Sequence, residues 1–145
     1  MRSRLTTQVL GFAGLTPFYL SLAGVALLED YPRALSVQGF VIYSLAILCF
    51  LSGALWGHAR SLPDRDQIGH LVISNGIVIF AVASVLTAQV VLAVLLLMLG
   101  YLALLWFERR TEETKNWYSA MRAQLTLGVV LAHLLYVGLN VGMLD

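Results

Sequence analysis

Charged residues are scarce in this sequence. Only 12% of its 145 residues are Asp, Glu, Lys or Arg, and 59% are hydrophobic, whereas a soluble domain carries about 25% charged residues. So little charge leaves too small a polar surface to cover a water-soluble globule, and the excess apolar surface needs lipid around it. The net charge of +1 gives no electrostatic support for binding nucleic acid.

Motifs that carry catalysis or metal binding are also missing. The single cysteine, Cys49, lies in an apolar run and can form no internal disulfide. No group of Cys and His residues has the spacing of a zinc or iron–sulfur site, and no hydrolase, zinc-protease or nucleotide-binding motif occurs. All eight Asp and Glu residues lie in predicted loops or at a terminus. We therefore expect a protein that is not an enzyme and that has no metal or cofactor.

Long apolar runs dominate the chain. A membrane-spanning helix needs about 20 mostly apolar residues. The run from Leu71 to Phe107 has no charged residue, and as one helix it would be about 55 Å long, far more than the roughly 30 Å hydrocarbon core. We therefore predict a turn near residues 87–90 and an all-α bundle of five transmembrane helices in a single domain, residues 1–145. The predicted helices are about 5–28, 36–58, 68–87, 90–107 and 120–143.

Basic residues are distributed unevenly between the two predicted sides. With five spans, eight of the nine Lys and Arg residues fall on the side of the N-terminus, and only Arg33 falls on the other. Because cytoplasmic segments are enriched in Lys and Arg, we predict a cytoplasmic N-terminus and an external C-terminus. The first apolar stretch is too long for a signal peptide and no A-x-A site follows it. We expect a retained first helix and a multi-pass protein of the bacterial inner membrane.

The last predicted helix carries a polar stripe, whose members recur at helical spacing and so share one face. They are Ser119, Arg122, Thr126, His133, Tyr136 and Asn140. Polar side chains inside a membrane turn inward to find partners, and Asn75 on the third predicted helix is a candidate partner. Two interpretations follow: a polar pathway through His133, Tyr136, Asn140 and Asn75, or simple hydrogen bonding between helices.

A second group of residues lies at the predicted cytoplasmic ends of the helices. Its members are Trp56, His58, Trp117, Arg122 and Thr126. An interfacial guanidinium with aromatic neighbours can bind an anionic head group, a lipid phosphate or a quinone carbonyl. Aromatic residues at this level also serve as plain interfacial anchors. We name the group a candidate ligand-binding site.

Proline and glycine residues mark predicted bends and close contacts. Pro17 interrupts the first predicted helix and removes a backbone donor. Two glycine pairs, Gly53 with Gly57 and Gly138 with Gly142, match the small-x-x-x-small pattern of close helix packing. The pattern suits contacts within the chain and contacts between two chains equally.

Three segments together resemble a known family. They are Gly11-Phe-Ala-Gly-Leu-Thr-Pro-Phe18, Phe50-Leu-Ser-Gly-Ala-Leu-Trp-Gly57 and Trp117-Tyr-Ser-Ala-Met-Arg-Ala-Gln-Leu-Thr126. Their order and spacing are similar to those of small proteobacterial integral membrane proteins that form a domain-of-unknown-function family. Members often have a polar or basic residue before the Trp-Gly pair, where this chain has Leu55.

The resemblance implies a polytopic membrane fold and an animal mitochondrial relative, and it brings no activity. The positions that match the family pattern are Pro17, Gly53, Trp56, Gly57, Trp117, Arg122 and Thr126.

Two functional hypotheses remain. The first is an accessory or assembly protein, or a binder of a lipid-like or quinone-like molecule, with membrane lipids and another membrane complex or a second copy as partners. The alternative is a small homo-oligomeric transporter or channel with its pathway along the last helix.

Overall fold

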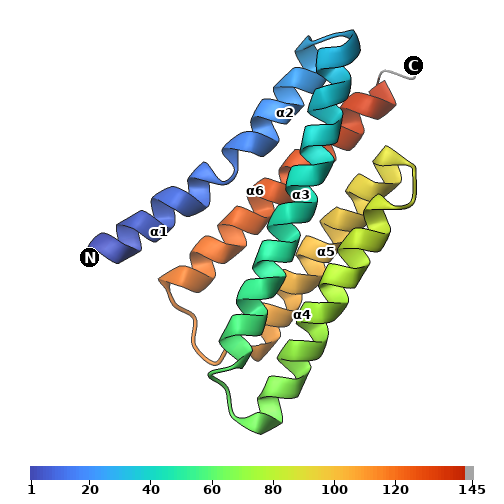
Figure 1. Cartoon of the computed structure of the whole chain (residues 1–145). Coiled ribbons are helices and arrows are strands. Elements are labelled where there is room, and N and C mark those ends of the chain that lie inside the picture. The colour runs from blue at the N-terminus through green and yellow to red at the C-terminus, as the bar shows by residue number, and fades with distance from the viewer. Residues whose placement is uncertain (143–145) are drawn as a thin grey trace.

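Six α-helices form the part of the chain that the computed structural model describes, residues 1–142. In chain order they are α1 (Arg2–Ala13), α2 (Thr16–Leu27), α3 (Asp30–Ala59), α4 (Asp64–Val85), α5 (Val90–Thr111) and α6 (Trp117–Gly142). Figure 1 shows α3 to α6 running side by side with α2, whereas α1 diverges from the bundle.

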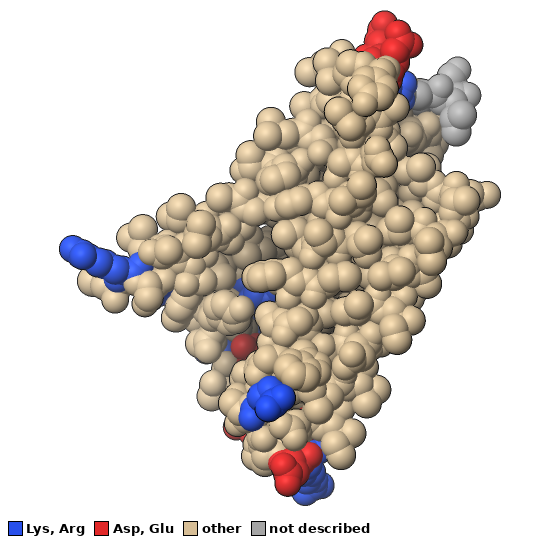
Figure 2. All heavy atoms as spheres, viewed as in Figure 1, with Lys and Arg blue, Asp and Glu red and all other residues tan. Residues whose placement is uncertain are grey.

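Within residues 1–142, five helical segments are long and apolar enough to cross a membrane, with α1 and α2 together making the first. The prediction of five spans is confirmed, and the chain is a multi-pass membrane protein. Large apolar side chains cover the outside of the bundle; Phe50, for example, is 71% exposed. Figure 2 shows charged atoms on this face at the ends of the molecule and in a hollow beside α1, with an uncharged surface between them.

The helix ends differ from the predicted ranges, most clearly in the first two spans. The first span is broken at residues 14–15, and Pro17 lies in the first turn of α2, where its missing N–H leaves no helical bond unmade. The second span begins at Asp30 rather than near residue 36, because Pro32 is tolerated in a first helical turn. The uncharged run divides at residues 86–89, between α4 and α5.

The helices of the bundle close into a ring. Helix α3 contacts α2 and α4, α4 contacts α5, α5 contacts α6, and α6 returns to α2, while α3 and α5 also touch across the ring. Helix α1 packs mainly on α6 and buries none of its residues. The chain therefore forms a closed five-helix ring with an exposed helical arm at its N-terminus.

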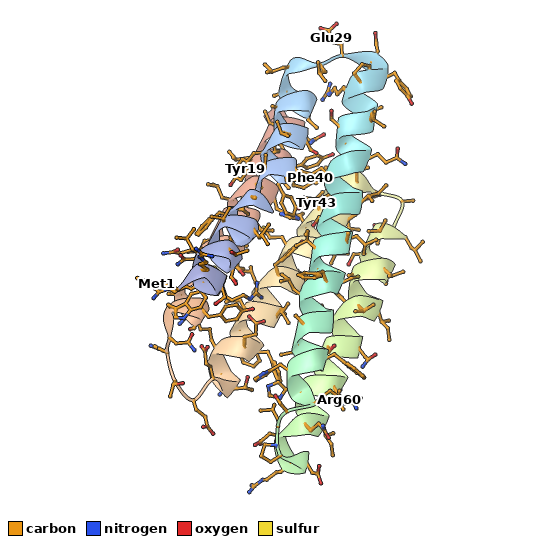
Figure 3. All side chains as sticks on the ribbon, turned by 60° about the vertical axis from the view of Figure 1, so that its left-hand side comes forward. Met1, Tyr19, Glu29, Phe40, Tyr43 and Arg60 are labelled. Atoms are coloured by element: carbon orange, nitrogen blue, oxygen red, sulfur yellow. The ribbon has the colours of Figure 1, made fainter. Side chains whose placement is uncertain are left out.

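Aromatic side chains fill the middle of the ring. Phe18 lies edge-on to Phe40 with ring centroids 5.6 Å apart, and Phe40 stacks on Tyr136 at 4.8 Å. Figure 3 shows Phe40 and Tyr43 pointing from α3 toward the neighbouring helices. These rings surround the polar centre of the molecule.

Candidate functional site

The polar stripe of the last span faces the interior, as its spacing predicts. Ser119, Arg122, Thr126, His133 and Tyr136 are buried along α6. Asn140 is half-buried and donates to the Tyr136 carbonyl oxygen at 2.9 Å, within its own helix. The stripe divides into two parts with different surroundings: a sealed centre at His133 and a cleft at Arg122.

Both ring nitrogens of His133 have partners inside the bundle. The ring is fully buried. Its Nδ1 lies 2.7 Å from the Val129 carbonyl oxygen and its Nε2 2.7 Å from the Ser44 hydroxyl. A carbonyl only accepts, so Nδ1 carries the hydrogen and Ser44 donates to Nε2. Tyr101 in turn donates to the Ser44 carbonyl at 2.7 Å.

Rings close over His133 on several sides. Phe40, Tyr101 and Phe18 have ring centroids 5.0, 5.5 and 5.7 Å from the imidazole. At the level of His133 the polar stripe therefore makes a hydrogen bond between helices. This arrangement fits the interpretation of hydrogen bonding between helices rather than that of a polar pathway.

The predicted partner Asn75 is not in this centre. It is exposed on α4 and donates to the Leu71 carbonyl of its own helix at 2.8 Å. Its neighbour Ser74 faces inward instead and donates to the Ser52 carbonyl at 2.7 Å. The prediction that Asn75 joins the α6 stripe is wrong, because its position on the helix points it away from α6.

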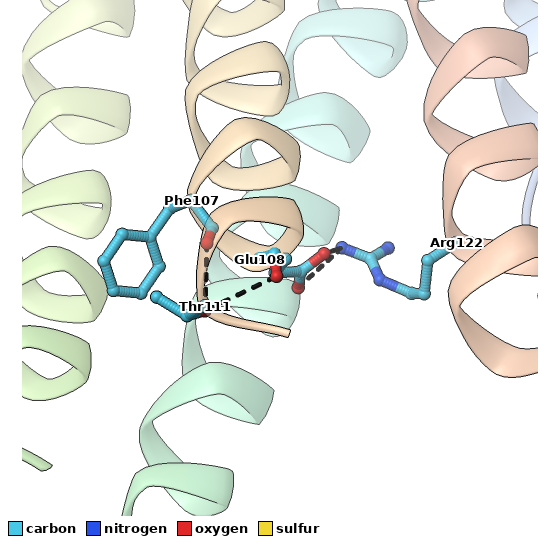
Figure 4. A network of polar contacts seen from close by, with 4 residues as sticks. All are labelled: Phe107, Glu108, Thr111 and Arg122. Atoms are coloured by element: carbon cyan, nitrogen blue, oxygen red, sulfur yellow. Dashed lines mark hydrogen bonds and ion pairs between the residues drawn. The ribbon is translucent and has the colours of Figure 1, made fainter. Parts of the chain in front are cut away.

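A partly buried ion pair lies nearer the beginning of α6. The Nη2 atom of Arg122 donates to both carboxylate oxygens of Glu108, each at 3.0 Å (Figure 4). The Arg122 side chain is 9% exposed and that of Glu108 25%. Glu108 was expected in a solvated loop, but α5 continues through it to Thr111. The Arg122–Glu108 ion pair therefore links α6 to α5.

Local helix ends hold this pair in place. The Asn116 side chain accepts a 2.9 Å hydrogen bond from the Ser119 N–H, an N-cap that fixes where α6 begins. The Thr111 hydroxyl donates to the Phe107 carbonyl at 2.9 Å in the last turn of α5. Glu108 thus sits one turn before the end of one helix, and Arg122 sits in the second turn of the next.

A cleft opens beside Arg122, between the α1 arm and the ring. Its volume is about 140 Å³, and its walls come from α1, α2, α3, α5 and α6. Arg122 and Thr126 line it from α6, and the remaining lining is almost entirely apolar. Leu10 and Phe50 line it while being 67% and 71% exposed, so its mouth lies on the apolar outer surface. Figure 2 shows basic and acidic atoms deep in this hollow.

Tyrosine hydroxyls anchor the broken first span above the cleft. Tyr43 donates to the Gly14 carbonyl at 2.8 Å, an oxygen at the break between α1 and α2. Tyr19 donates to the Gly128 carbonyl at 2.7 Å and ties α2 to α6. A carbonyl group at the break is therefore hydrogen-bonded to α3, which holds the C-terminal end of α1 against the bundle.

The ligand-binding group predicted from the sequence is divided by the structure. Arg122 and Thr126 line the cleft. Trp117 lies at the start of α6 with the Arg4 guanidinium 4.9 Å from its ring. Trp56 and His58 lie on α3 outside the cleft lining; Trp56 is next to Arg60 and His58 is next to His70. The structure therefore does not bring all five residues into a single site, because Trp56 and His58 lie outside the cleft that Arg122 and Thr126 line.

The predicted glycine pairs do not pack within the chain. A Cβ added at Gly53, Gly57, Gly138 or Gly142 would meet no described atom within 4 Å. Close contacts occur at other glycines: a Cβ at Gly100 would lie 2.7 Å from Leu48, and one at Gly128 would lie 2.9 Å from Leu15. Packing against the described residues therefore accounts for neither pair. Sequence spacing alone did not indicate Gly100 or Gly128.

The chain was compared with protein-family models, with curated proteins and with solved structures, and it matches a family model. No curated protein and no solved structure matches the chain. The family model that does match is described as a protein of unknown function, DUF3429, and it covers residues 3–138. The animal mitochondrial relative implied by the resemblance stays a prediction. The match spans nearly the whole helical ring and its arm, and on that extent the chain belongs to the DUF3429 family.

Proposed function

We propose that this protein binds a lipid-like or quinone-like amphipathic molecule in the cleft between α1 and the ring, without catalysing a reaction. The observation that carries the proposal is the buried Arg122 guanidinium at the polar end of an otherwise apolar cleft. Polar groups in a membrane need partners, and a cleft whose mouth is apolar admits molecules from the bilayer.

A role as an accessory or assembly factor is compatible with such binding. A membrane partner complex, or a second copy using the exposed Gly53 and Gly57 face, would then act on the loaded protein. The transport alternative has less support, since Ser44 and Val129 occupy both nitrogens of His133.

We propose the bacterial inner membrane as the location, with the N-terminus in the cytoplasm. The support is the eight-to-one distribution of Lys and Arg. Reporter fusions at Ser61 and Thr87 test it: a cytoplasm-active reporter should work at Ser61 and a periplasm-active one at Thr87. The reverse pattern would overturn this orientation.

Native mass spectrometry of the gently extracted protein tests the binding. A small-molecule adduct is expected on the wild type and on an Arg110→Gln control, whose arginine stacks on Trp106 at 4.9 Å outside the cleft. The double variant Arg122→Met with Glu108→Gln should lose the adduct. Removing both charges together avoids leaving one buried charge unpaired. A wild type without adduct, or a double variant that keeps it, would contradict the proposal.

A further inference from the structure

The charges beside the cleft determine which head group it accepts. We infer that the molecule bound there presents an uncharged carbonyl oxygen to Arg122, on a ring or an ester, and not a phosphate or carboxylate. This inference rests on the proposed function and adds the chemical class of the ligand.

The ion pair leaves the cleft without net charge. Glu108 lies 3.0 Å from Arg122 through both of its oxygens, so the positive charge is already matched. An entering phosphate or carboxylate would place a second negative charge close to Glu108, and the partial burial of the pair weakens the screening of that repulsion. An uncharged head group avoids this repulsion.

Hydrogen-bond donors nevertheless remain at the same place. A guanidinium has five N–H donors, and both bonds to Glu108 leave from Nη2. Among the described residues, no acceptor contacts Nη1 or Nε of Arg122, and the Thr126 hydroxyl has no partner. Both residues line the cleft. The combination of unused donors and balanced charge suits a neutral acceptor, and a carbonyl oxygen is the acceptor that lipids and quinones offer.

The size of the cleft limits the head group to about one ring. Its volume is about 140 Å³, close to the roughly 150 Å³ cavity that admits a benzene molecule. The apolar tail would leave through the mouth between Leu10 and Phe50. A six-membered ring with carbonyl groups fits this space, and so does the ester end of an acyl chain.

Competition by native mass spectrometry separates these chemistries in a single sample. The purified protein is titrated with dioleoylglycerol and dioleoyl phosphatidic acid, which share their tails and differ in the phosphate, and with decylubiquinone. Wild-type protein should prefer the uncharged probes by about tenfold or more. Tighter binding of dioleoylglycerol would then identify the bound group as an ester carbonyl. Tighter binding of decylubiquinone would identify it as a ring carbonyl.

The Glu108→Gln variant tests the cause of that preference. Its affinity for phosphatidic acid, relative to that for dioleoylglycerol, should be about tenfold higher than in wild type, and its helical circular dichroism in detergent shows that it folds. Glu112→Gln, in the exposed segment after α5, is the matched control and should behave as wild type. Tighter binding of phosphatidic acid by wild type, or an unchanged preference in Glu108→Gln, would overturn the inference and leave the proposed function standing. Binding of none of the three probes would overturn both.

Discussion

The Ser44 hydroxyl on α3 donates a 2.7 Å hydrogen bond to Nε2 of His133 on α6, in the fully buried centre of the ring. Helices α3 and α6 are not neighbours in the ring, so this bond joins its opposite sides. It also gives the buried His133 side chain a structural role.

Ser44→Ala should therefore destabilise the protein. The substitution leaves Nε2 without a donor, and a hydrogen bond between membrane helices contributes about 0.6 kcal/mol on average, up to about 1.7 kcal/mol. We expect a loss in the upper part of that range, because the nitrogen is sealed from water. Thermal unfolding in detergent measures it. Asn75→Ala is the control and should change little, since Asn75 bonds only to its own helix; equal losses in both variants would contradict this role of Ser44.

Gly100 allows α5 to approach α3 closely. A Cβ there would lie 2.7 Å from a methyl group of Leu48, which is fully buried and has little room to move. Gly100→Ala should thus cost about 1–3 kcal/mol of unfolding free energy, as overpacking of a core does.

Gly53→Ala is the matched comparison for Gly100→Ala. It adds a methyl group in open space and removes a poor helix former, so its effect should be neutral or stabilising by up to about 1 kcal/mol. Unfolding titrations of the two variants in mixed micelles compare them. A destabilisation of Gly53→Ala that depends on protein concentration would instead indicate that this face contacts a second chain.

The turn between α4 and α5 contains a strained residue. Ala88 has φ of 62°, a left-handed conformation that costs an L-residue about 1 kcal/mol or more and glycine almost nothing. Ala88→Gly should raise the unfolding free energy by about 0.5–1 kcal/mol. Leu86→Gly, at an ordinary φ of −75°, should lower it. A lower melting temperature for Ala88→Gly would show that the turn adopts another conformation in the folded protein.

The fold could be predicted from the sequence because a lipid bilayer allows few kinds of membrane-spanning structure. Run length determines the number of spans, and the uncharged stretch from Leu71 to Phe107 was too long for one of them. Helical spacing also indicated that Arg122, Thr126 and His133 face inward. The number of spans depends on the thickness of the bilayer. The inward face of a helix depends on the pattern of residues within that helix alone.

Features that depend on which helices are neighbours were not predictable. Trp56 and Arg122 lie at the same predicted level, but Trp56 is exposed on α3 outside the cleft that Arg122 lines. Glu108 opens a run of mixed charges that resembles a loop, and only its distance from Arg122 shows that it is part of the site. Glycine spacing failed for the same reason, because close packing at Gly100 depends on the Leu48 side chain opposite it.

Photo-crosslinking from two positions of α6 tests binding in the cleft most directly. A diazirine amino acid at position 125 replaces Leu125, which lines the cleft, and one at position 127 replaces Leu127, which is 63% exposed on the outer surface. Position 125 should capture one amphipathic molecule, saturably, and position 127 a non-saturable mixture of bulk lipids. Capture of the same non-saturable mixture from both positions would contradict the account.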